Sequence, residues 1–167
     1  YQGGFNNNFR YKNFNLRIST YFNYGNKVFS NNLRFMLNDG HEPYYNQIQL
    51  PDDAKVWTGP GDTQATEPSP QNSANSTETS SRYLKNGSYF SIRNIALSYR
   101  LPKAWSNRIS MEGITIGITA DNVATLSNFL GQDPQTTIQA GNFVTPGVSD
   151  FKYPNNRQYL FNINFNF

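Results

Sequence analysis

Residues 157 to 167 read RQYLFNINFNF, and the side chains in this stretch alternate between two kinds. One set is aromatic or aliphatic: Tyr159, Phe161, Ile163, Phe165 and Phe167. The other set is mostly asparagine: Leu160, Asn162, Asn164 and Asn166. Because successive side chains of a strand point to opposite faces, the alternation predicts a strand with one apolar face and one amide-lined face. The apolar face lies either on a soluble core or in lipid.

The composition favours lipid over a soluble core. Aromatic residues make up 16% of the 167 residues, and asparagine occurs 24 times. Charged residues make up 15%, whereas soluble domains contain about 25%. No run of about 18 apolar residues is present, which excludes a membrane-spanning helix. A β-barrel alternates polar and apolar residues, so it is compatible with the mean hydropathy of -0.68.

The chain has no cysteine, which excludes disulfides, zinc–cysteine sites and thiol catalysis. The net charge of +3 does not indicate nucleic-acid binding, because the basic residues are dispersed along the chain. Seven of the eleven acidic residues lie between positions 39 and 78. The chain begins YQGGFNNNF, without Met or a basic segment leading into an apolar one, so we expect Tyr1 to be an internal position of a longer protein.

Four further segments show the same two-residue period. We expect strands at about 3–11, 14–25, 87–101, 114–123 and 157–167. Lys12-Asn13 is compatible with a tight hairpin, and residues 102–113 with a short connection that contains one helical turn. In the third strand Phe90 and Ile92 fall out of phase with Ile95 and the residues after it. We therefore expect a bulge there, or burial against something inside the barrel.

Two segments lose the period: residues 26–86, with many proline, glycine, serine, threonine and asparagine residues, and residues 124–156, rich in glycine, proline, glutamine and threonine. We expect two long surface loops without regular structure, the first partly ordered by Tyr44, Tyr45 and Trp57. The connections thus run short, long, short, long, as in outer-membrane barrels with short periplasmic turns and long extracellular loops. Because an antiparallel sheet alternates direction, this assignment places the C-terminus in the periplasm.

Three stretches resemble the C-terminal end of the SusC/RagA family of TonB-dependent transporters of the Bacteroidetes outer membrane. They are SRYLKNGSYFSIRNIALSYRLPKAW (81–105), ITADNVATLSNFLGQDPQ (118–135) and YPNNRQYLFNINFNF (153–167). The matching residues are Asn86, Gly87, Ser88, Tyr89, Arg93, Asn94, Tyr99, Leu101, Pro102, Asn122, Gly131, Asp133, Pro134, Tyr153, Pro154, Arg157 and Phe167. Val123-Ala124 departs from the usual Leu-Phe, and Asn162 stands where a small residue is common.

The resemblance implies an all-β transmembrane antiparallel barrel of about 22 strands with a plug inside it. Five strands cannot close such a barrel, so we expect this chain to be its C-terminal part. The implied function is import of a nutrient, an oligosaccharide or an oligopeptide. The implied partners are TonB, a SusD-like lipoprotein lid, the barrel-assembly machinery and outer-membrane lipid. A passive porin-like barrel and a soluble β-sandwich that binds carbohydrate remain as alternatives.

The candidate site residues fall into three groups. Lumen-facing side chains could bind a polar solute or contact plug and water: Asn15, Arg17, Asn94, Arg100, Asp121, Asn162, Asn164 and Asn166. Loop aromatics could stack on sugar rings: Tyr44, Tyr45, Trp57 and Phe129. The last strand could be the signal read by the barrel-assembly machinery: Phe161, Ile163, Phe165 and Phe167.

The sequence does not indicate an enzyme, because no set of nucleophile, base and orienting group is apparent. We expect no catalytic residue, cofactor or metal site. The acidic segment 39–78 matches no EF-hand, and we interpret it as a solvated loop, with contacts to a lid protein or a cation as alternatives.

Overall fold

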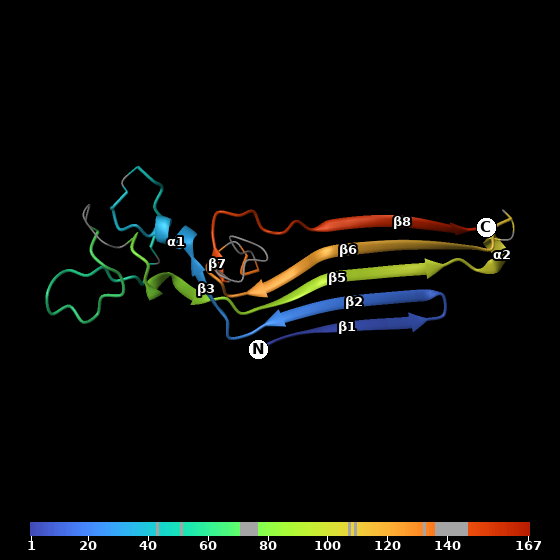
Figure 1. Cartoon of the computed structure of the whole chain (residues 1–167), viewed down its shortest axis with the longest axis horizontal. Coiled ribbons are helices and arrows are strands. Elements are labelled where there is room, and N and C mark those ends of the chain that lie inside the picture. Colours follow the sequence, from blue (N-terminus) through green and yellow to red (C-terminus); the bar gives the residue numbers. More distant parts are fainter. Residues whose placement is uncertain are drawn as a thin grey trace. The chain divides into compact units, whose positions relative to one another are not determined.

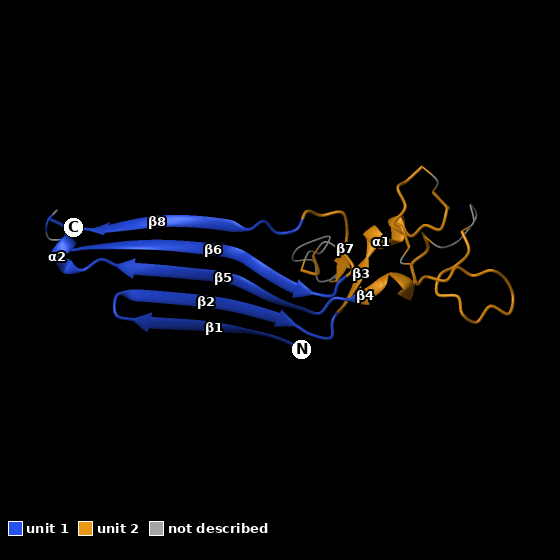
Figure 2. Ribbon diagram, turned by 180° about the vertical axis from the view of Figure 1, so that it is seen from behind, with its two compact units in different colours: residues 1–26, 86–129, 154–167 blue, residues 27–85, 130–153 orange. Residues whose placement is uncertain are grey.

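The computed structural model of the chain describes residues 1–42, 44–50, 52–70, 77–106, 108, 110–131, 133–135 and 147–167. These residues form two compact units, shown in different colours in Figure 2. Unit 1 comprises residues 1–26, 86–129 and 154–167. Unit 2 comprises residues 27–85 and 130–153. Most of the two expected long loops therefore belong to a unit of their own.

Unit 1 is one antiparallel sheet whose five strands follow each other in chain order (Figure 1). The strands are β1 (Gln2–Tyr11), β2 (Phe14–Asn23), β5 (Tyr89–Arg100), β6 (Gly113–Ser127) and β8 (Gln158–Asn166). The shortest has 9 residues and the longest 15. Strands of soluble sandwiches are nearer five or six residues, roughly half this length. β6 continues to Ser127, beyond the end near residue 123 that the sequence predicts.

The pairing register places most apolar residues of the five strands on one face of this sheet, whereas Tyr21 and Leu160 lie on the other. Neighbours across β2 and β5 include Phe14 with Tyr99, whose ring centroids lie 4.5 Å apart. Across β6 and β8, Ile116 pairs with Ile163 and Ile118 with Phe161. Each such cross-strand pair contributes about 0.2–1 kcal/mol. The apolar alternation that each strand shows separately thus becomes one continuous apolar face.

The predicted bulge in β5 is confirmed, and it lies at Arg93. The pairing of β5 with β2 shifts between Asn94 and Ile92, and the pairing with β6 shifts at the same place. The extra residue changes the phase of the strand. Ile92 consequently pairs with Thr20 and Ala124, and so joins the apolar face.

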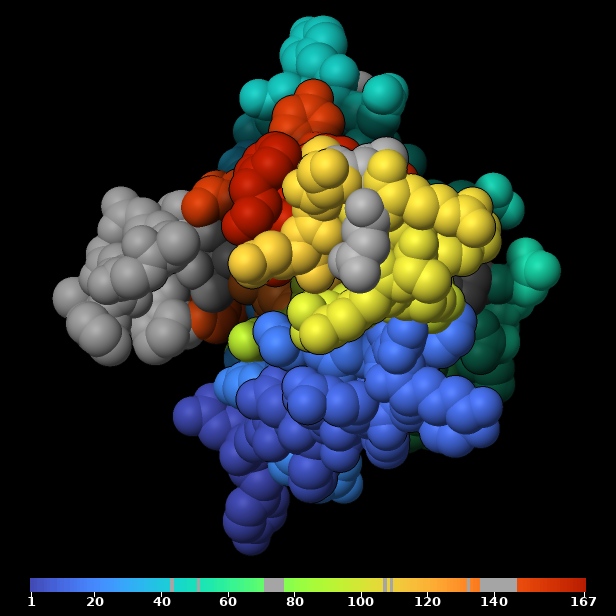
Figure 3. All heavy atoms as spheres, turned by 90° about the vertical axis from the view of Figure 1, so that its right-hand side faces the viewer, coloured from blue at the N-terminus to red at the C-terminus, as the bar shows by residue number. Residues whose placement is uncertain are grey.

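The two short connections have the expected form. β1 and β2 are joined by a two-residue turn in which Lys12 adopts a φ of +51°, and Tyr11 pairs with Phe14 across it. The connection from β5 to β6 contains the predicted helical turn, α2 (Lys103–Ser106). Figure 3 views this end of the sheet, with the hairpin in blue, the α2 connection in yellow and the C-terminal residues in red.

Unit 2 contains regular structure that the sequence pattern does not predict. Its elements are β3 (Lys27–Ser30), α1 (Asn31–Met36), η2 (Ser81–Tyr83), β4 (Leu84–Asn86) and β7 (Val148–Ser149). The three strands form a sheet in the order β4-β3-β7, with β3 and β7 parallel. Among the residues that the structure describes, no helix is long and apolar enough to cross a membrane.

Of the three aromatics expected to order the first loop in part, Tyr45 meets the Phe35 ring edge to face, with centroids 6.4 Å apart. The Tyr44 side chain is 95% exposed, whereas the buried residues of unit 2 include Val28 and Tyr83, which is 0% exposed. The Tyr83 ring meets Phe29 edge to face, with centroids 6.1 Å apart. Ser30 caps α1 by accepting a hydrogen bond from the Leu33 N–H, which ends β3 and starts the helix. Short elements and their buried side chains therefore order this unit together with the Tyr45 ring.

Candidate functional site

The polar face of the unit 1 sheet is the candidate functional surface. The strand register aligns residues across it in rows, one of which runs from Arg10 through Asn15, Ser98 and Gly117 to Asn162. The eight residues predicted to face a lumen all lie on this face: Asn15, Arg17, Asn94, Arg100, Asp121, Asn162, Asn164 and Asn166. The structure thus brings them together on one surface, and their contact with a lumen stays a prediction.

The polar side chains near the bulge form hydrogen bonds and a cation–π contact with one another. Asn94 donates from Nδ2 to Asp121 Oδ1 over 2.6 Å. The Arg93 guanidinium lies 3.9 Å from the centre of the Tyr21 ring, a cation–π contact. The Tyr21 hydroxyl in turn donates to Gln2 Oε1 over 2.9 Å. These contacts fix the side chains at the end of the sheet away from the β1–β2 hairpin.

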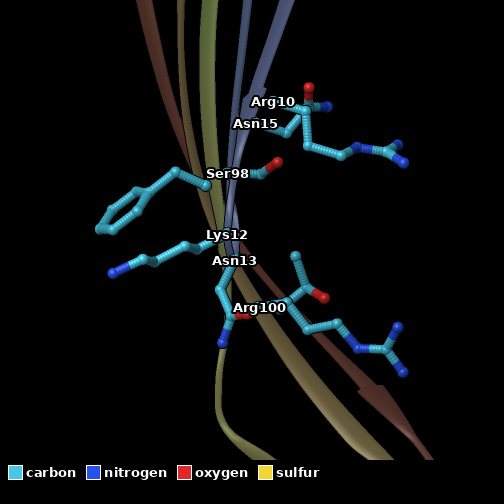
Figure 4. A pocket seen from close by; sticks show the side chains of 8 residues that line it. Arg10, Lys12, Asn13, Asn15, Ser98 and Arg100 are labelled. Carbon is cyan, nitrogen blue, oxygen red and sulfur yellow. The ribbon is translucent and has the colours of Figure 1, made fainter.

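A hollow of about 390 Å³ lies near the hairpin, at the other end of the sheet. Its lining includes Arg10, Asn15, Ser98, Arg100 and Thr115. In Figure 4 the side chains of Arg10, Asn15, Ser98 and Arg100 project to one side of the ribbon, whereas Lys12 projects to the other. The Oδ1 of Asn15 is buried and has no hydrogen-bond partner among the described residues. The hollow therefore offers cationic donors and hydroxyl groups.

The net charge of the polar face is positive. Its strands carry Arg10, Arg17, Arg93 and Arg100 but one acidic residue, Asp121. Within the part of the chain that the structure describes, both ion pairs involve Arg82 of unit 2. The four arginines of the polar face consequently have no carboxylate partner there.

Gly117 permits a close approach between β6 and β8 on this face. A Cβ atom at Gly117 would lie 2.5 Å from Asn162 Oδ1, which is closer than nonbonded atoms approach, and 3.1 Å from Asn162 Cγ, which is a tight contact. The Asn162 side chain therefore lies over the glycine backbone. The asparagine that departs from the family pattern is accommodated by the glycine opposite it.

The four predicted loop aromatics do not form one site. Tyr44 and Trp57 lie in unit 2, and Phe129 is buried in unit 1. Tyr45 lines an apolar hollow of about 460 Å³ with Phe35 and Phe151, which the sequence reasoning missed. The Phe35 ring lies 6.4 Å from that of Tyr45 and 5.7 Å from that of Phe151. Ligand binding by the four predicted aromatics stays a prediction.

Arg82 organises the acidic segment of unit 2. Its guanidinium donates to both carboxylate oxygens of Asp39, to Glu67 Oε2 and to the Leu37 carbonyl. Burial opposes the charge of Arg82, but the two carboxylates outweigh it and raise the Arg82 pKa above its usual value. Two acidic residues of the segment are thus structural, and not simply solvated as expected.

Two other titratable groups of unit 2 respond to their surroundings. Burial raises the pKa of the Tyr83 phenol. Hydrogen bonds from the backbone N–H groups of Gln64 and Thr58 lower the pKa of Asp62. No group of three or more His, Cys, Asp and Glu side chains within the described ranges could hold a metal ion.

The residues of the predicted assembly signal lie at an edge of the sheet. Phe161, Ile163 and Phe165 belong to β8, the last strand in the order, and pair with apolar residues of β6. Phe167 follows the end of the strand. The edge of β8 that faces away from β6 has no neighbouring strand in this sheet. A role in assembly stays a prediction.

Long antiparallel strands with one apolar and one polar face define the wall of a membrane β-barrel, as predicted. The chain is homologous to TonB-dependent receptors over its whole length. It is 25% identical over 168 residues to TonB-dependent receptor P3 of Formosa agariphila, and 24% identical over 172 residues to receptor P39 of the same organism. These alignments cover 98% and 100% of the chain. No protein-family model matches the chain.

The fold is also that of part of a solved transporter. The RagAB peptide importer in its open-open state matches with a TM-score of 0.77 and 24% identity, and in its closed-closed state with 0.75 and 22%. The matches cover 99% and 98% of this chain but 17% of each importer chain. The chain spans about a sixth of the length of the receptors as well, since it covers 16% of each.

Proposed function

We propose that the chain forms part of the barrel wall of a TonB-dependent importer in the bacterial outer membrane, which takes up an oligosaccharide or an oligopeptide. The observation that carries the proposal is the strand register of unit 1, which separates an apolar from a polar face over five long strands. Lipid would cover the apolar face, and the polar face would line the lumen. Homology to TonB-dependent receptors supports the coupling to TonB.

The connections suggest how this wall is oriented. The hairpin at Lys12-Asn13 and the α2 connection would face the periplasm, together with the C-terminus. The residues of unit 2 come from the two long connections and would face the outside. A SusD-like lipoprotein would close over that side as a lid. The acidic residues of unit 2 outside the Arg82 pairs, such as Asp52 and Asp53, are candidates for contact with it.

Import would proceed in three steps. The nutrient would bind beneath the lid, TonB would pull on a plug through a segment outside this chain, and the displaced plug would open a path to the periplasm. Asparagine, serine and threonine side chains on the polar face can exchange hydrogen bonds with water, plug and solute. Such groups retain a solute weakly enough for it to leave, which transport requires.

The last strand would also guide assembly of the barrel. An unpaired strand edge can be recognised by strand addition, in which main-chain hydrogen bonds give affinity and alternate side chains give selectivity. The alternate side chains of β8 are Phe161, Ile163 and Phe165, followed by Phe167. The barrel-assembly machinery would recognise these residues.

Uptake by whole cells tests the proposal. Cells that produce the full-length protein would be given fluorescent oligosaccharides and oligopeptides, and uptake would be compared with that of cells lacking the protein, TonB or the lid lipoprotein. We expect uptake of one substrate class, and its loss in all three deletion strains. Uptake that persists without TonB would contradict the proposal and support a passive porin.

A further inference from the structure

A second hollow in unit 1 lies at the end of the sheet away from the β1–β2 hairpin, where β2 and β6 end and β5 begins (Figure 1). Its volume is about 420 Å³, within the range of about 300–1,000 Å³ that is usual for ligand sites. Phe22, Phe90 and Leu126 line it. They form one row of the apolar face, because Phe90 pairs with Phe22 on β2 and with Leu126 on β6. The hollow therefore continues the apolar face at its end.

The other lining groups are polar but uncharged. No described residue that lines the hollow is acidic or basic. The side chains of Tyr24 and Asn128 line it and form no hydrogen bond with another described residue. Asn86 Oδ1 accepts hydrogen bonds from the backbone N–H and the hydroxyl of Ser88, which fixes the Asn86 amide beside them. The hollow thus offers neutral amide and hydroxyl groups to a ligand.

The Phe22 ring is held in place by its neighbours on β1. It lies over Gly3, where an added Cβ atom would come within 2.9 Å of the ring. It also stacks on the Phe5 ring, with centroids 6.2 Å apart. A fixed aromatic ring beside neutral hydrogen-bonding groups suits a sugar, whose C–H groups pack on the ring and whose hydroxyl groups bond to amides and hydroxyls.

The same lining disfavours two other occupants. A phospholipid headgroup carries a phosphate, which proteins bind with Arg or Lys, and neither lines the hollow. A soluble sugar would leave Phe90 and Leu126, which are 38% and 65% exposed, without an apolar partner. A lipid with a sugar headgroup satisfies both parts, because its acyl chains cover the apolar row and its sugar contacts the polar groups.

From these observations we propose that the hollow lined by Phe22, Phe90 and Asn128 binds a glycolipid of the outer leaflet. A sugar ring of the headgroup packs on Phe22 and forms hydrogen bonds with Tyr24 and Asn128. An acyl chain lies on Phe90 and Leu126. This inference rests on the proposed function, which puts the apolar face in lipid and this end of the sheet at the outside of the membrane. The outer leaflet of such a membrane contains its glycolipid, lipopolysaccharide.

Native mass spectrometry of the full-length protein tests this glycolipid site. The protein, purified in detergent, is titrated with rough lipopolysaccharide, with the deacylated saccharide made from it, and with phosphatidylglycerol. We expect one lipopolysaccharide to bind at least about tenfold more tightly than either other probe. The double substitution Tyr24→Ala with Asn128→Ala should weaken its binding at least about tenfold.

Tyr11→Ala is the matched control and should leave the affinity for lipopolysaccharide unchanged. Tyr11 pairs with Phe14 on the apolar face at the hairpin end of the sheet. Its side chain is 70% exposed, against 66% for Tyr24. The two tyrosines therefore differ in which end of the apolar face they occupy, and not in how much of the ring is exposed.

Four results would overturn the glycolipid site. They are equal affinity for the deacylated saccharide, equal affinity for phosphatidylglycerol, unchanged affinity in the folded double variant, and an equal loss in Tyr11→Ala. If the double variant does not assemble, a benzophenone amino acid at Leu126 decides the question in cells. Capture of lipopolysaccharide would support the site, and capture of phospholipid alone or of no lipid would overturn it.

Uptake by cells that produce the unmodified protein is measured separately. Selective binding of lipopolysaccharide without TonB-dependent uptake would refute the proposed import function alone. TonB-dependent uptake without selective binding of lipopolysaccharide would refute the glycolipid site alone.

Discussion

Replacing Arg82 with glutamine is expected to destabilise unit 2 locally. The substitution leaves two carboxylates without their partner, those of Asp39 and Glu67, whose side chains are 7% and 23% exposed. Removing one member of a fully buried ion pair costs about 3–5 kcal/mol. Because Arg82 is 21% exposed and Glu67 is similarly hydrated, we reduce this to about 2–3 kcal/mol. That free energy corresponds to a local opening equilibrium about 30- to 150-fold larger.

Hydrogen exchange of the full-length protein in lipid nanodiscs measures this opening. Amides in residues 37–42, 55–67 and 81–84 should exchange faster in Arg82→Gln, whereas those of β2 and β5 should not change. Because the pKa of Arg82 is raised in the folded state, its ion pairs stabilise unit 2 fully at every pH below the usual arginine pKa, and this stabilisation is lost only above that pKa. The increase in exchange caused by Arg82→Gln should therefore be equal at about pH 6 and about pH 9. Lys85→Gln is the matched control, since Lys85 has no ion pair within the described residues. Equal exchange in the two variants would refute the reasoning.

Three further predictions concern the sheet of unit 1. Phe167→Asn should lower the amount of assembled barrel in the outer membrane but leave uptake per assembled molecule unchanged, and normal surface levels would rule out the assembly signal. Gly117→Val should destabilise the barrel by about 1–3 kcal/mol, because the valine side chain overlaps Asn162. Urea titration in lipid vesicles measures the loss of stability. Unchanged stability would contradict the prediction and show that Asn162 moves away freely. Ile118→Arg should lower the stability of the barrel by about 2–4 kcal/mol in the same titration, and Thr119→Arg should lower it much less. Equal losses of stability would contradict the assignment of lipid to one face of the sheet and water to the other.

The sheet of unit 1 could be predicted from the sequence because each of its strands shows its own alternation of polar and apolar residues over a continuous segment. A period of two residues marks each strand, and the phase change between Ile92 and Ile95 marks the bulge at Arg93. The same period assigned all eight predicted polar-face residues to one face. It could equally have assigned Arg10 and Ser98, which share their phase but were not singled out.

Unit 2 could not be predicted because its strands and helices are short and its contacts join residues that are distant in sequence. β3 has 4 residues and β7 has 2, too few to show a period. Asn31 donates to Asp150 across 119 positions of the chain, and Arg82 reaches Asp39 across 43. Such pairings depend on the folded path of the chain, and no local pattern encodes them. The hollow formed by Phe35, Tyr45 and Phe151 was missed for the same reason.

We propose that the apolar face of the unit 1 sheet contacts lipid and that its polar face contacts water. Ile118 and Thr119 are neighbours on β6 and their side chains lie on opposite faces of the sheet. The chain has no cysteine, so the substitutions Ile118→Cys and Thr119→Cys each introduce a single site for a spin label. The two labels therefore report on the two faces separately. In the full-length protein in lipid vesicles, the label at Ile118 should be relaxed more by oxygen than by a water-soluble nickel complex. The label at Thr119 should show the reverse. A label at Ile118 that neither reagent reaches would instead indicate a buried soluble core, and would contradict the account.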